Sequence, residues 1–247
     1  MNIGQIDRNM KNLLSEINFN KINRSNFPGS MDPSEIFSFI SLIKKNKINL
    51  VIESGRQYGY STYFIGKYCQ KNNIRFISID DGTNKKADLF SHNILKNILV
   101  KYYYGNFFFV IKKILLLSQK KNIAMLIDGP KGIQVYAFCY EWLKKNKNIN
   151  FIFFDNYFFQ SKIRQQICHK IFSKVYSYEN LNFSNEINMS LNKFNTKHKK
   201  KNSRINDFAY INLNSYRNSW YSVFLRNSIN FYYKQRRSFA NIFKKNK

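Results

Sequence analysis

Cysteine and histidine are scarce in this chain, and their placement excludes two common kinds of site. The three cysteines, Cys69, Cys139 and Cys168, lie far apart and form no CxxC pair. An odd number of separated cysteines indicates neither a disulfide framework nor a zinc site, so a reducing cytoplasm is the expected location. The three histidines likewise show no mutual spacing typical of metal ligands.

The sequence also lacks a hydrophobic run long enough to cross a membrane. Residues 1–26 have no apolar core of the kind found in signal peptides, and the most apolar stretch, residues 107–117, is interrupted by Lys112 and Lys113. The hydrophobic content of 44% and the length of 247 residues are those of a globular protein with one substantial core. We therefore expect one main domain.

Acidic residues are greatly outnumbered by basic ones. The chain has 41 Lys and Arg against 14 Asp and Glu, a formal net charge of +27. Such a charge favours nucleic acid or an anionic membrane as a partner. However, Lys, Asn, Ile, Phe and Tyr are abundant throughout, as an AT-rich coding sequence produces without selection for a binding surface. The charge alone does not establish a polyanion-binding function.

Short apolar runs alternate with helix-length segments through the middle of the chain. The runs predict buried strands at residues 48–52, 75–79, 100–104, 123–127 and 150–154. The intervening segments predict helices at residues 60–70, 92–99, 107–118 and 132–145. An earlier helix is expected after Asp32 and Pro33, a pair typical of a helix start.

This alternation predicts an α/β fold, a doubly wound and mostly parallel sheet with helices on both faces. Apolar segments at residues 208–213 and 220–225 would close the sheet, giving seven strands. Ligands in such folds bind at the carboxyl ends of the strands. Functional residues are therefore expected just after each strand.

Composition divides the chain into three parts. Residues 1–30 form a polar lead-in with a short helix near residues 10–17, residues 31–228 form the main domain, and residues 229–247 form a basic, aromatic tail. Within the domain, residues 180–206 are rich in Asn, Ser and Lys, which predicts a loop or an insertion.

The first predicted strand is followed by an acidic residue and two glycines. Glu53 ends the strand, and Gly55 and Gly59 make the turn into a helix that begins near Ser61. Glycine lets the backbone approach a ligand closely, and a helix N-terminus offers unpaired amide donors. The motif is neither GxGxxG nor a phosphate loop, because no Gly-Lys-Ser/Thr follows. It indicates a nucleoside-cofactor loop, with an ordinary strand-to-helix turn as the alternative.

The loop resembles that of the class I S-adenosylmethionine-dependent methyltransferases, in which an acidic strand end is followed by GxxxGxS/T. The resemblance implies that Glu53, Gly55, Gly59 and Ser61 contact the amino acid end of the cofactor.

After the second strand, the same family places a carboxylate that accepts hydrogen bonds from both ribose hydroxyls. Asp80 fits this role, with Asp81 as the runner-up, although a turn carboxylate is the alternative. After the third strand, Asn106 stands where the family contacts adenine, although capping of the next helix explains it equally well.

Polar residues after the fourth and fifth strands extend the resemblance. The segments are Asp-Gly-Pro-Lys-Gly from Asp128 and Asp-Asn at Asp155. They resemble metal-dependent O-methyltransferases of the catechol and caffeoyl type, and also sugar and macrolide O-methyltransferases. By this resemblance Asp128, Asp155 and Asn156 would hold Mg²⁺, whose preferred ligands are oxygens. Asp128 would also adjoin the cofactor, and Lys131 would be the general base. A surface turn and a strand-end cap are the alternatives.

The resemblance covers about residues 28–160 and implies methyl transfer from S-adenosylmethionine to a hydroxyl of a small molecule or saccharide. A second interpretation is an RNA-binding or other polyanion-binding protein, motivated by the basic runs at residues 197–201 and 234–247. The same tail could instead attach the protein to an anionic membrane. A third interpretation is a catalytically degenerate domain that keeps the methyltransferase fold.

Overall fold

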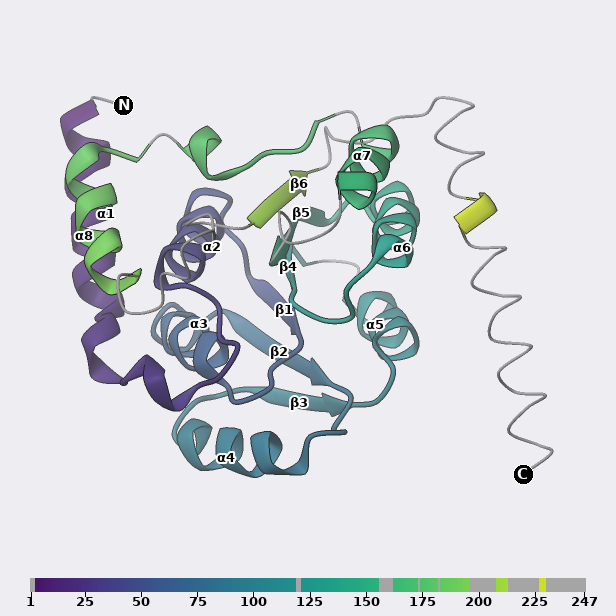
Figure 1. Cartoon of the computed structure of the whole chain (residues 1–247), viewed down its shortest axis with the longest axis horizontal. Coiled ribbons are helices and arrows are strands. Elements are labelled where there is room, and N and C mark those ends of the chain that lie inside the picture. Colours follow the sequence, from purple (N-terminus) through teal and green to yellow (C-terminus); the bar gives the residue numbers. More distant parts are fainter. Residues whose placement is uncertain are drawn as a thin grey trace.

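A mixed β-sheet lies at the centre of the computed structural model (Figure 1). The described part of the chain comprises residues 3–118, 121–155, 162–172, 174–181, 183–195, 208–212 and 227–229. Its strands are β1 Leu50–Ser54, β2 Arg75–Asp80, β3 Lys101–Tyr104, β4 Ile123–Ile127, β5 Ile149–Asp155 and β6 Phe208–Asn212. Within these residues the sheet has six strands in the order β3-β2-β1-β4-β5-β6. All neighbours are parallel except β5 and β6.

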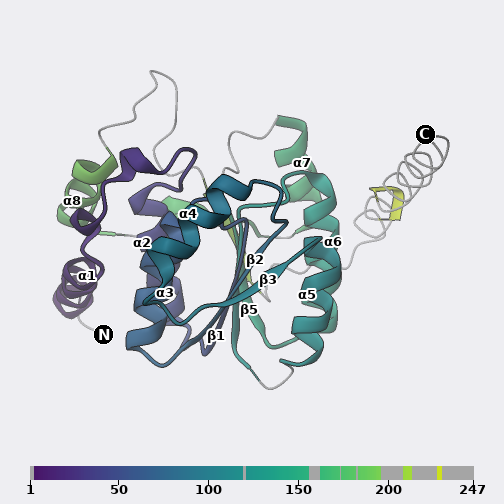
Figure 2. The same cartoon turned by 90° about the horizontal axis from the view of Figure 1, so that it is seen from below.

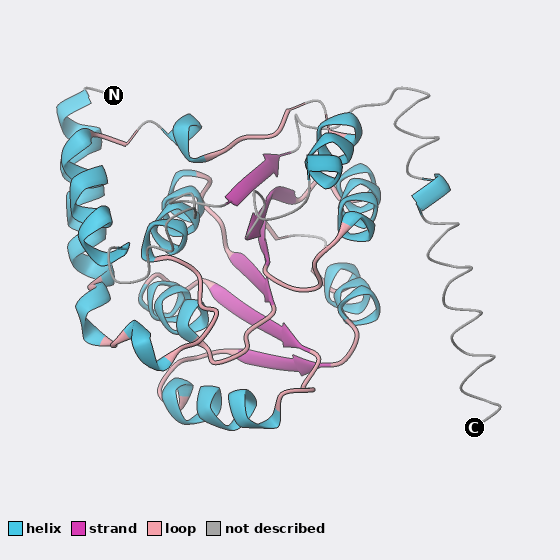
Figure 3. Cartoon of the chain, in the orientation of Figure 1, coloured by secondary structure: helices cyan, strands magenta, loops and turns pink. Residues whose placement is uncertain are grey.

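Helices cover both faces of this sheet (Figures 2 and 3). On one face lie α1 Ile3–Ile17, α2 Pro33–Lys45, α3 Tyr60–Lys71, α4 Lys85–Leu95 and α8 Asn185–Asn195. On the other lie α5 Phe107–Leu116, α6 Ile133–Lys145 and α7 Lys162–Ile171. Single 3₁₀ turns occur at η1 Phe19–Lys21, η2 Arg24–Asn26 and η3 Tyr178–Leu181. No helix in the described ranges has the length and apolar character needed to cross a bilayer.

The core consists of two apolar clusters, one on each side of the sheet. Successive strand residues point to opposite faces, so Val51 packs in the cluster with α2 and α3, whereas Ile52 packs in the cluster with α5 and α6. Every residue of β1 and of β4 is buried, which explains why these strands appear as continuous apolar runs rather than as alternating ones.

The α/β prediction with a mostly parallel sheet is confirmed. Each of the five strands predicted in the middle of the chain is present within two residues of its expected bounds, and β6 confirms the strand expected at residues 208–213. The strand expected at residues 220–225, which would be the seventh, lies outside the described residues, as does the tail at residues 230–247.

Three elements differ from the prediction. The helix expected at residues 92–99 lies earlier, because Asn84 caps α4 by accepting a hydrogen bond from the amide of Ala87 at 3.1 Å. β3 is not buried: it is the sheet edge, and Tyr104 is 46% exposed. The segment predicted as a loop at residues 180–206 contains α8, whose Ile187 and Leu191 are buried in the cluster with α2.

The loops after β1 and β4 touch each other where the direction of strand addition reverses. From β1 the chain adds β2 and β3 on one side, and then returns to add β4 and β5 on the other. Such a switch point opens a crevice at the carboxyl ends of the strands. Gly55 lies in this crevice with φ +92°, and a Cβ there would stand 2.8 Å from the backbone nitrogen of Gly129. Only glycine fits at this position without displacing backbone.

We expect Gly55→Ala to lower the free energy of unfolding by about 2–4 kcal/mol, because it combines a left-handed conformation with a backbone clash. Urea denaturation followed by circular dichroism measures this change. Gly29→Ala is the matched control: its φ is +70°, but its Cβ would meet only the Gln57 side chain at 3.6 Å. It should cost about 1 kcal/mol. Equal losses in the two variants would contradict the steric explanation.

Candidate functional site

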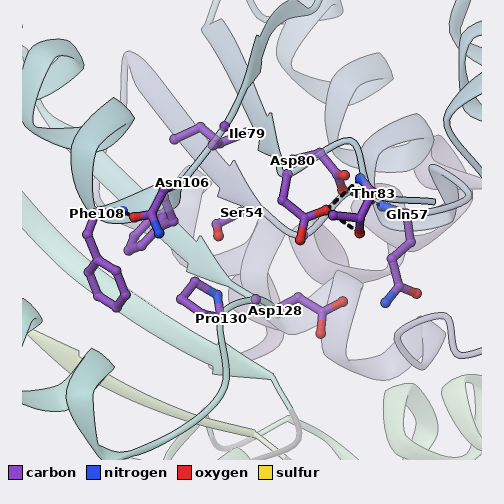
Figure 4. Close-up of a pocket in the computed structure, with 14 residues that line it drawn as sticks. Ser54, Gln57, Ile79, Asp80, Thr83, Asn106, Phe108, Asp128 and Pro130 are labelled. Carbon is purple, nitrogen blue, oxygen red and sulfur yellow. Dashed lines mark hydrogen bonds between the residues drawn. The ribbon is translucent and has the colours of Figure 1, made fainter. Parts of the chain in front are cut away.

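A cavity of about 290 Å³ opens at the carboxyl ends of β1, β2, β3 and β4 (Figure 4). Four of the predicted cofactor residues line it, namely Gly55, Asp80, Asn106 and Asp128. The remaining lining residues are Ser54, Gln57, Ile79, Asp81, Thr83, Gly105, Phe107, Phe108, Gly129 and Pro130. The site therefore combines the loops that follow four different strands.

The Asp80 carboxylate is fixed at the polar end of this cavity. Its Oδ2 accepts a hydrogen bond from the amide of Gln57 at 3.0 Å, and its Oδ1 accepts one from the amide of Gly82 at 2.9 Å. An ionised carboxylate has about four acceptor positions, so these two bonds leave about two of them unused. The side chain is thus both oriented and able to accept two further donors.

Asp81, the alternative to Asp80 as the ribose-binding carboxylate, forms different hydrogen bonds. Its Oδ1 accepts hydrogen bonds from the amide and the hydroxyl of Thr83, at 2.9 Å and 2.8 Å. These bonds, chiefly the one from the backbone amide, lower the pKa of Asp81 below its ordinary value. Its carboxylate closes a local turn, which favours Asp80 as the carboxylate that receives a diol.

The opposite end of the cavity is apolar. Figure 4 shows Ile79, Phe108 and Pro130 around it, away from Asp80 and Gln57. Asn106 lies at this end and caps α5, because its side chain accepts a hydrogen bond from the amide of Phe108 at 3.0 Å. The capping interpretation of Asn106 is confirmed, and its contact with adenine stays a prediction.

Glu53 lies behind the cavity rather than in it. Its side chain is fully buried and accepts hydrogen bonds from the hydroxyls of Ser61 and Thr62, each at 2.6 Å, and of Ser78 at 3.0 Å. Burial raises the pKa of Glu53 and the three hydroxyl bonds oppose that rise. These bonds fasten the start of α3 to β1 and β2. A direct contact of Glu53 or Ser61 with a cofactor stays a prediction.

Gly59 also lies outside the cavity lining. It is the N-cap of α3 with φ +84°, and a Cβ there would stand 3.1 Å from the Cβ of Ser91 in α4. Its conformational freedom lets α3 begin directly against α4. The loop residue thus supports the site through packing.

Lys131 bridges the two predicted aspartates next to the cavity. Its Nζ lies 3.0 Å from Asp128 Oδ1 and 3.7 Å from Asp155 Oδ2. Burial by itself would lower the pKa of Lys131, but the attraction of Asp128 and Asp155 outweighs it and raises that pKa. In this arrangement Lys131 is a protonated ammonium and not yet a base.

Asp155 is the most strongly perturbed carboxyl of this group. It is buried at the end of β5, and burial, followed by repulsion from Asp128 and Glu35, raises its pKa well above 3.8, although Lys131 opposes the rise. Glu35 comes from the first turn of α2, where it also accepts a hydrogen bond from the amide of Asp32 at 2.8 Å. Glu35 follows the predicted helix start at Asp32 and Pro33, and nothing in the local sequence indicates that it lies near β5.

Asp128 and Asp155 are two of the three residues predicted to hold magnesium, and both are described in the structure. Asp128 and Asp155 offer hard oxygen donors around one ammonium group, which suits a cation. Asn156, the third predicted ligand, lies outside the described residues. Within the described ranges, no group of three or more His, Cys, Asp or Glu side chains is placed to hold a metal ion.

Arg56 is a residue of the glycine loop that the sequence analysis missed. Its buried guanidinium pairs with Asp88 of α4 at 2.6 Å and donates to the Tyr104 hydroxyl of β3 at 3.2 Å. The guanidinium carbon also lies 4.9 Å from the ring centre of Tyr102. A lone cation between Gly55 and Gly59 was the available signal, but its partners are more than thirty positions away. Arg56 ties the loop to α4 and to the sheet edge.

Comparisons with known proteins give a similarity in fold. No protein-family model and no curated protein sequence matches the chain. A solved O-methyltransferase from Bacillus cereus in complex with SAH is 12% identical, with a TM-score of 0.43, over 83% of this chain and 91% of that one. An SAH-bound methyltransferase from Podospora anserina is 13% identical, with a TM-score of 0.47, over 88% and 97%.

A third similar structure is an O-methyltransferase from Streptomyces achromogenes, involved in tomaymycin synthesis and solved in complex with SAM. It is 12% identical, with a TM-score of 0.44, over 83% of this chain and 94% of that one. The chain is thus similar to S-adenosylmethionine-dependent O-methyltransferases over most of its length. At these identities the similarity concerns the fold alone.

We expect Arg56→Met to lower the free energy of unfolding by about 2–4 kcal/mol, because it leaves Asp88 without its buried partner. Thermal and urea denaturation measure the change. Lys71→Met is the control, since Lys71 forms an exposed ion pair with Glu16 at 3.1 Å. Its loss should cost at most about 1 kcal/mol. Similar costs for both substitutions would show that Arg56 does not anchor the loop.

The raised pKa of Asp155 should appear in the pH dependence of stability. The folded protein holds this proton more tightly than the unfolded chain does, so Asp155 favours folding at low pH. This contribution is complete below the ordinary pKa of 3.8 and is lost as the pH rises through the raised pKa. The stability of wild type relative to Asp155→Asn should therefore fall with rising pH, in buffer containing a chelator.

Asp81→Asn is the control for that measurement, because the pKa of Asp81 is lowered instead of raised. Its contribution is present above 3.8 and is lost as the pH falls through the lowered pKa, so the slope should have the opposite sign. Slopes of the same sign in the two variants would refute the assignment for Asp155.

Proposed function

We propose that the chain binds S-adenosylmethionine in the 290 Å³ cavity and transfers its methyl group to a hydroxyl of a small molecule or saccharide. The observation that carries this proposal is the Asp80 carboxylate, which two backbone amides orient at one end of a cavity whose other end is apolar. A nucleoside has the same division, with a polar diol at one end and a flat, largely apolar base at the other.

The lining residues support one placement of the cofactor. The ribose hydroxyls would donate to the open acceptor positions of Asp80, and the adenine would lie among Ile79, Phe108 and Pro130. The amino acid end would then lie along the backbone at Gly55, where the absence of a side chain permits close approach. This direction leads the reactive methyl group toward Asp128.

The chemistry of transfer to oxygen requires removal of a proton from the acceptor. Lys131 is the side chain we assign to this role, and its approach to Asp128 at 3.0 Å places it next to the cavity. The raised pKa of Lys131 opposes this role for as long as both aspartates keep their negative charge. Lys131 can act as a base at neutral pH only where those charges are compensated.

Magnesium would provide such compensation. Asp128, Asp155 and the predicted Asn156 would hold it, and when bound it would acidify an acceptor hydroxyl. Burial, followed by repulsion from Asp128 and Glu35, raises the pKa of Asp155, and the observation in favour of a metal is that a dication would relieve this repulsion. The other residues act without it: Asp80 orients the nucleoside, Glu53 fixes the loop from behind, and Arg56 anchors that loop to α4.

Calorimetric titration with S-adenosylmethionine and S-adenosylhomocysteine tests the proposal. We expect Asp80→Ala to weaken binding by roughly 10- to 100-fold, because two hydrogen bonds to a charged group are lost. Asp81→Ala is the matched control and should change the affinity by less than about threefold, since Asp81 bonds only within its own turn. Each titration is repeated with magnesium.

The outcomes separate the interpretations of the sequence. Binding that depends on Asp80 supports the cofactor site, and tighter binding in the presence of magnesium supports the metal. Binding without a magnesium effect favours a metal-independent methyltransferase. An absence of binding under all conditions, with wild type folded, contradicts the proposal and leaves the degenerate or polyanion-binding interpretation.

A further inference from the structure

The helix α5 and its C-cap residue Leu117 expose three large apolar side chains on one side. Phe109, Leu116 and Leu117 are 61%, 62% and 84% exposed. Lys112 and Lys113 lie between them in sequence and are exposed as well. We call these five residues the α5 outer face. Positions i, i+3, i+4, i+7 and i+8 of a helix lie on one side, so the five form a continuous strip.

The rest of α5 is fully used by the fold. Phe107, Ile111, Ile114 and Leu115 are buried in the cluster that α5 shares with α6 and the sheet. Figure 2 shows α5 in the outer layer on this side of the sheet. The exposed apolar residues are therefore not needed to hold the helix in place. Exposed apolar side chains gathered on one strip are typical of a contact with another apolar phase or partner.

The stretch of sequence that contains the strip carries charge of one sign. No acidic residue occurs between Asp88 and Asp128, a stretch that contains all of β3 and α5. Besides the two lysines of the strip, Lys96, Lys101 and Lys121 in this stretch are exposed. Lys112 and Lys113 within the strip therefore favour a partner that is apolar just below a negatively charged surface.

We infer that the α5 outer face binds the surface of an anionic lipid bilayer. Phe109, Leu116 and Leu117 would enter the boundary between headgroups and acyl chains, while Lys112 and Lys113 would stay at the level of the phosphates. The combination of apolar and basic side chains disfavours two other binding partners. A second copy of the strip would bring lysines against lysines, and a nucleic acid backbone would leave the leucines in contact with charged phosphates.

The inference does not depend on the proposed methyltransferase activity. It also differs from attachment through the basic runs at residues 197–201 and 234–247, which was considered above because of their charge. Insertion of leucines adds to the free energy of membrane binding a contribution that salt does not screen. The two sources of membrane binding are therefore separable by substitution at Leu116 and Leu117.

Vesicle sedimentation of the full chain tests this, with phosphatidylcholine alone and with phosphatidylcholine containing phosphatidylglycerol. We expect wild type to prefer the anionic vesicles, and Leu116→Gln with Leu117→Gln to weaken that binding by roughly tenfold or more. Lys112→Gln with Lys113→Gln should weaken it by about fivefold for each charge removed. The matched control, Leu89→Gln with Met189→Gln, removes exposed apolar side chains from α4 and α8 on the other face of the sheet and should bind as wild type does.

A fluorescent label gives the second readout. All three native cysteines are buried, so Leu117→Cys offers one accessible thiol for an environment-sensitive dye. Its emission should shift to the blue on anionic vesicles, whereas the same dye at Met189→Cys should not shift. The inference would be overturned if the leucine substitutions left vesicle binding unchanged. It would also be overturned if the dye at position 117 stayed in water when the protein bound vesicles. A dimer in solution that those substitutions dissociate would overturn it as well.

Discussion

Ser54, the last residue of β1, accepts hydrogen bonds from the amides of Asp128 at 2.9 Å and Gly129 at 3.1 Å. These two bonds hold the loops after β1 and β4 together at the point where the order of strands reverses. Gly55 permits that contact because it has no Cβ, and its own amide donates to the carbonyl of Ile79 at 2.9 Å. The cavity, the direction of Asp80 and the position of Lys131 all depend on this junction of three strand ends.

Three carboxyl groups near the junction are compensated in three different ways. Glu53, which has no exposed surface, receives three hydroxyl donors, and Asp80 receives two backbone amides. Asp155 depends on an ammonium group that it shares with Asp128. Hydrogen bonds from hydroxyls and amides hold a carboxylate in one position. A lysine shared by two aspartates balances their charges in a way that a bound ligand can change. The proton removal that we propose involves the last arrangement, in which Lys131 lies between Asp128 and Asp155.

The sequence predicted the sheet well because its strands are buried on both faces and appear as uninterrupted apolar runs, as in β4. It placed α4 too late, because the cap at Asn84 is a single side-chain bond in a polar segment. It predicted that Asp80 and Asp128 lie close together, because the carboxyl ends of parallel strands meet at one edge of the sheet. Glu35 and Arg56 were missed, since their charges act on partners that only the folded chain brings near.

The strand order also separates the site into two stretches of chain. The residues that we assign to the nucleoside lie between Gly55 and Pro130, most of them before Phe108, whereas Lys131 and Asp155 belong to the second half of the sheet. Backbone contact at a glycine joins the stretches, and no side chain of one completes the hydrogen bonds of Asp80 in the other. Changes at Lys131 and after β5 would therefore alter the acceptor side of the proposed site and leave Ile79, Asp80 and Phe108 on its nucleoside side unchanged.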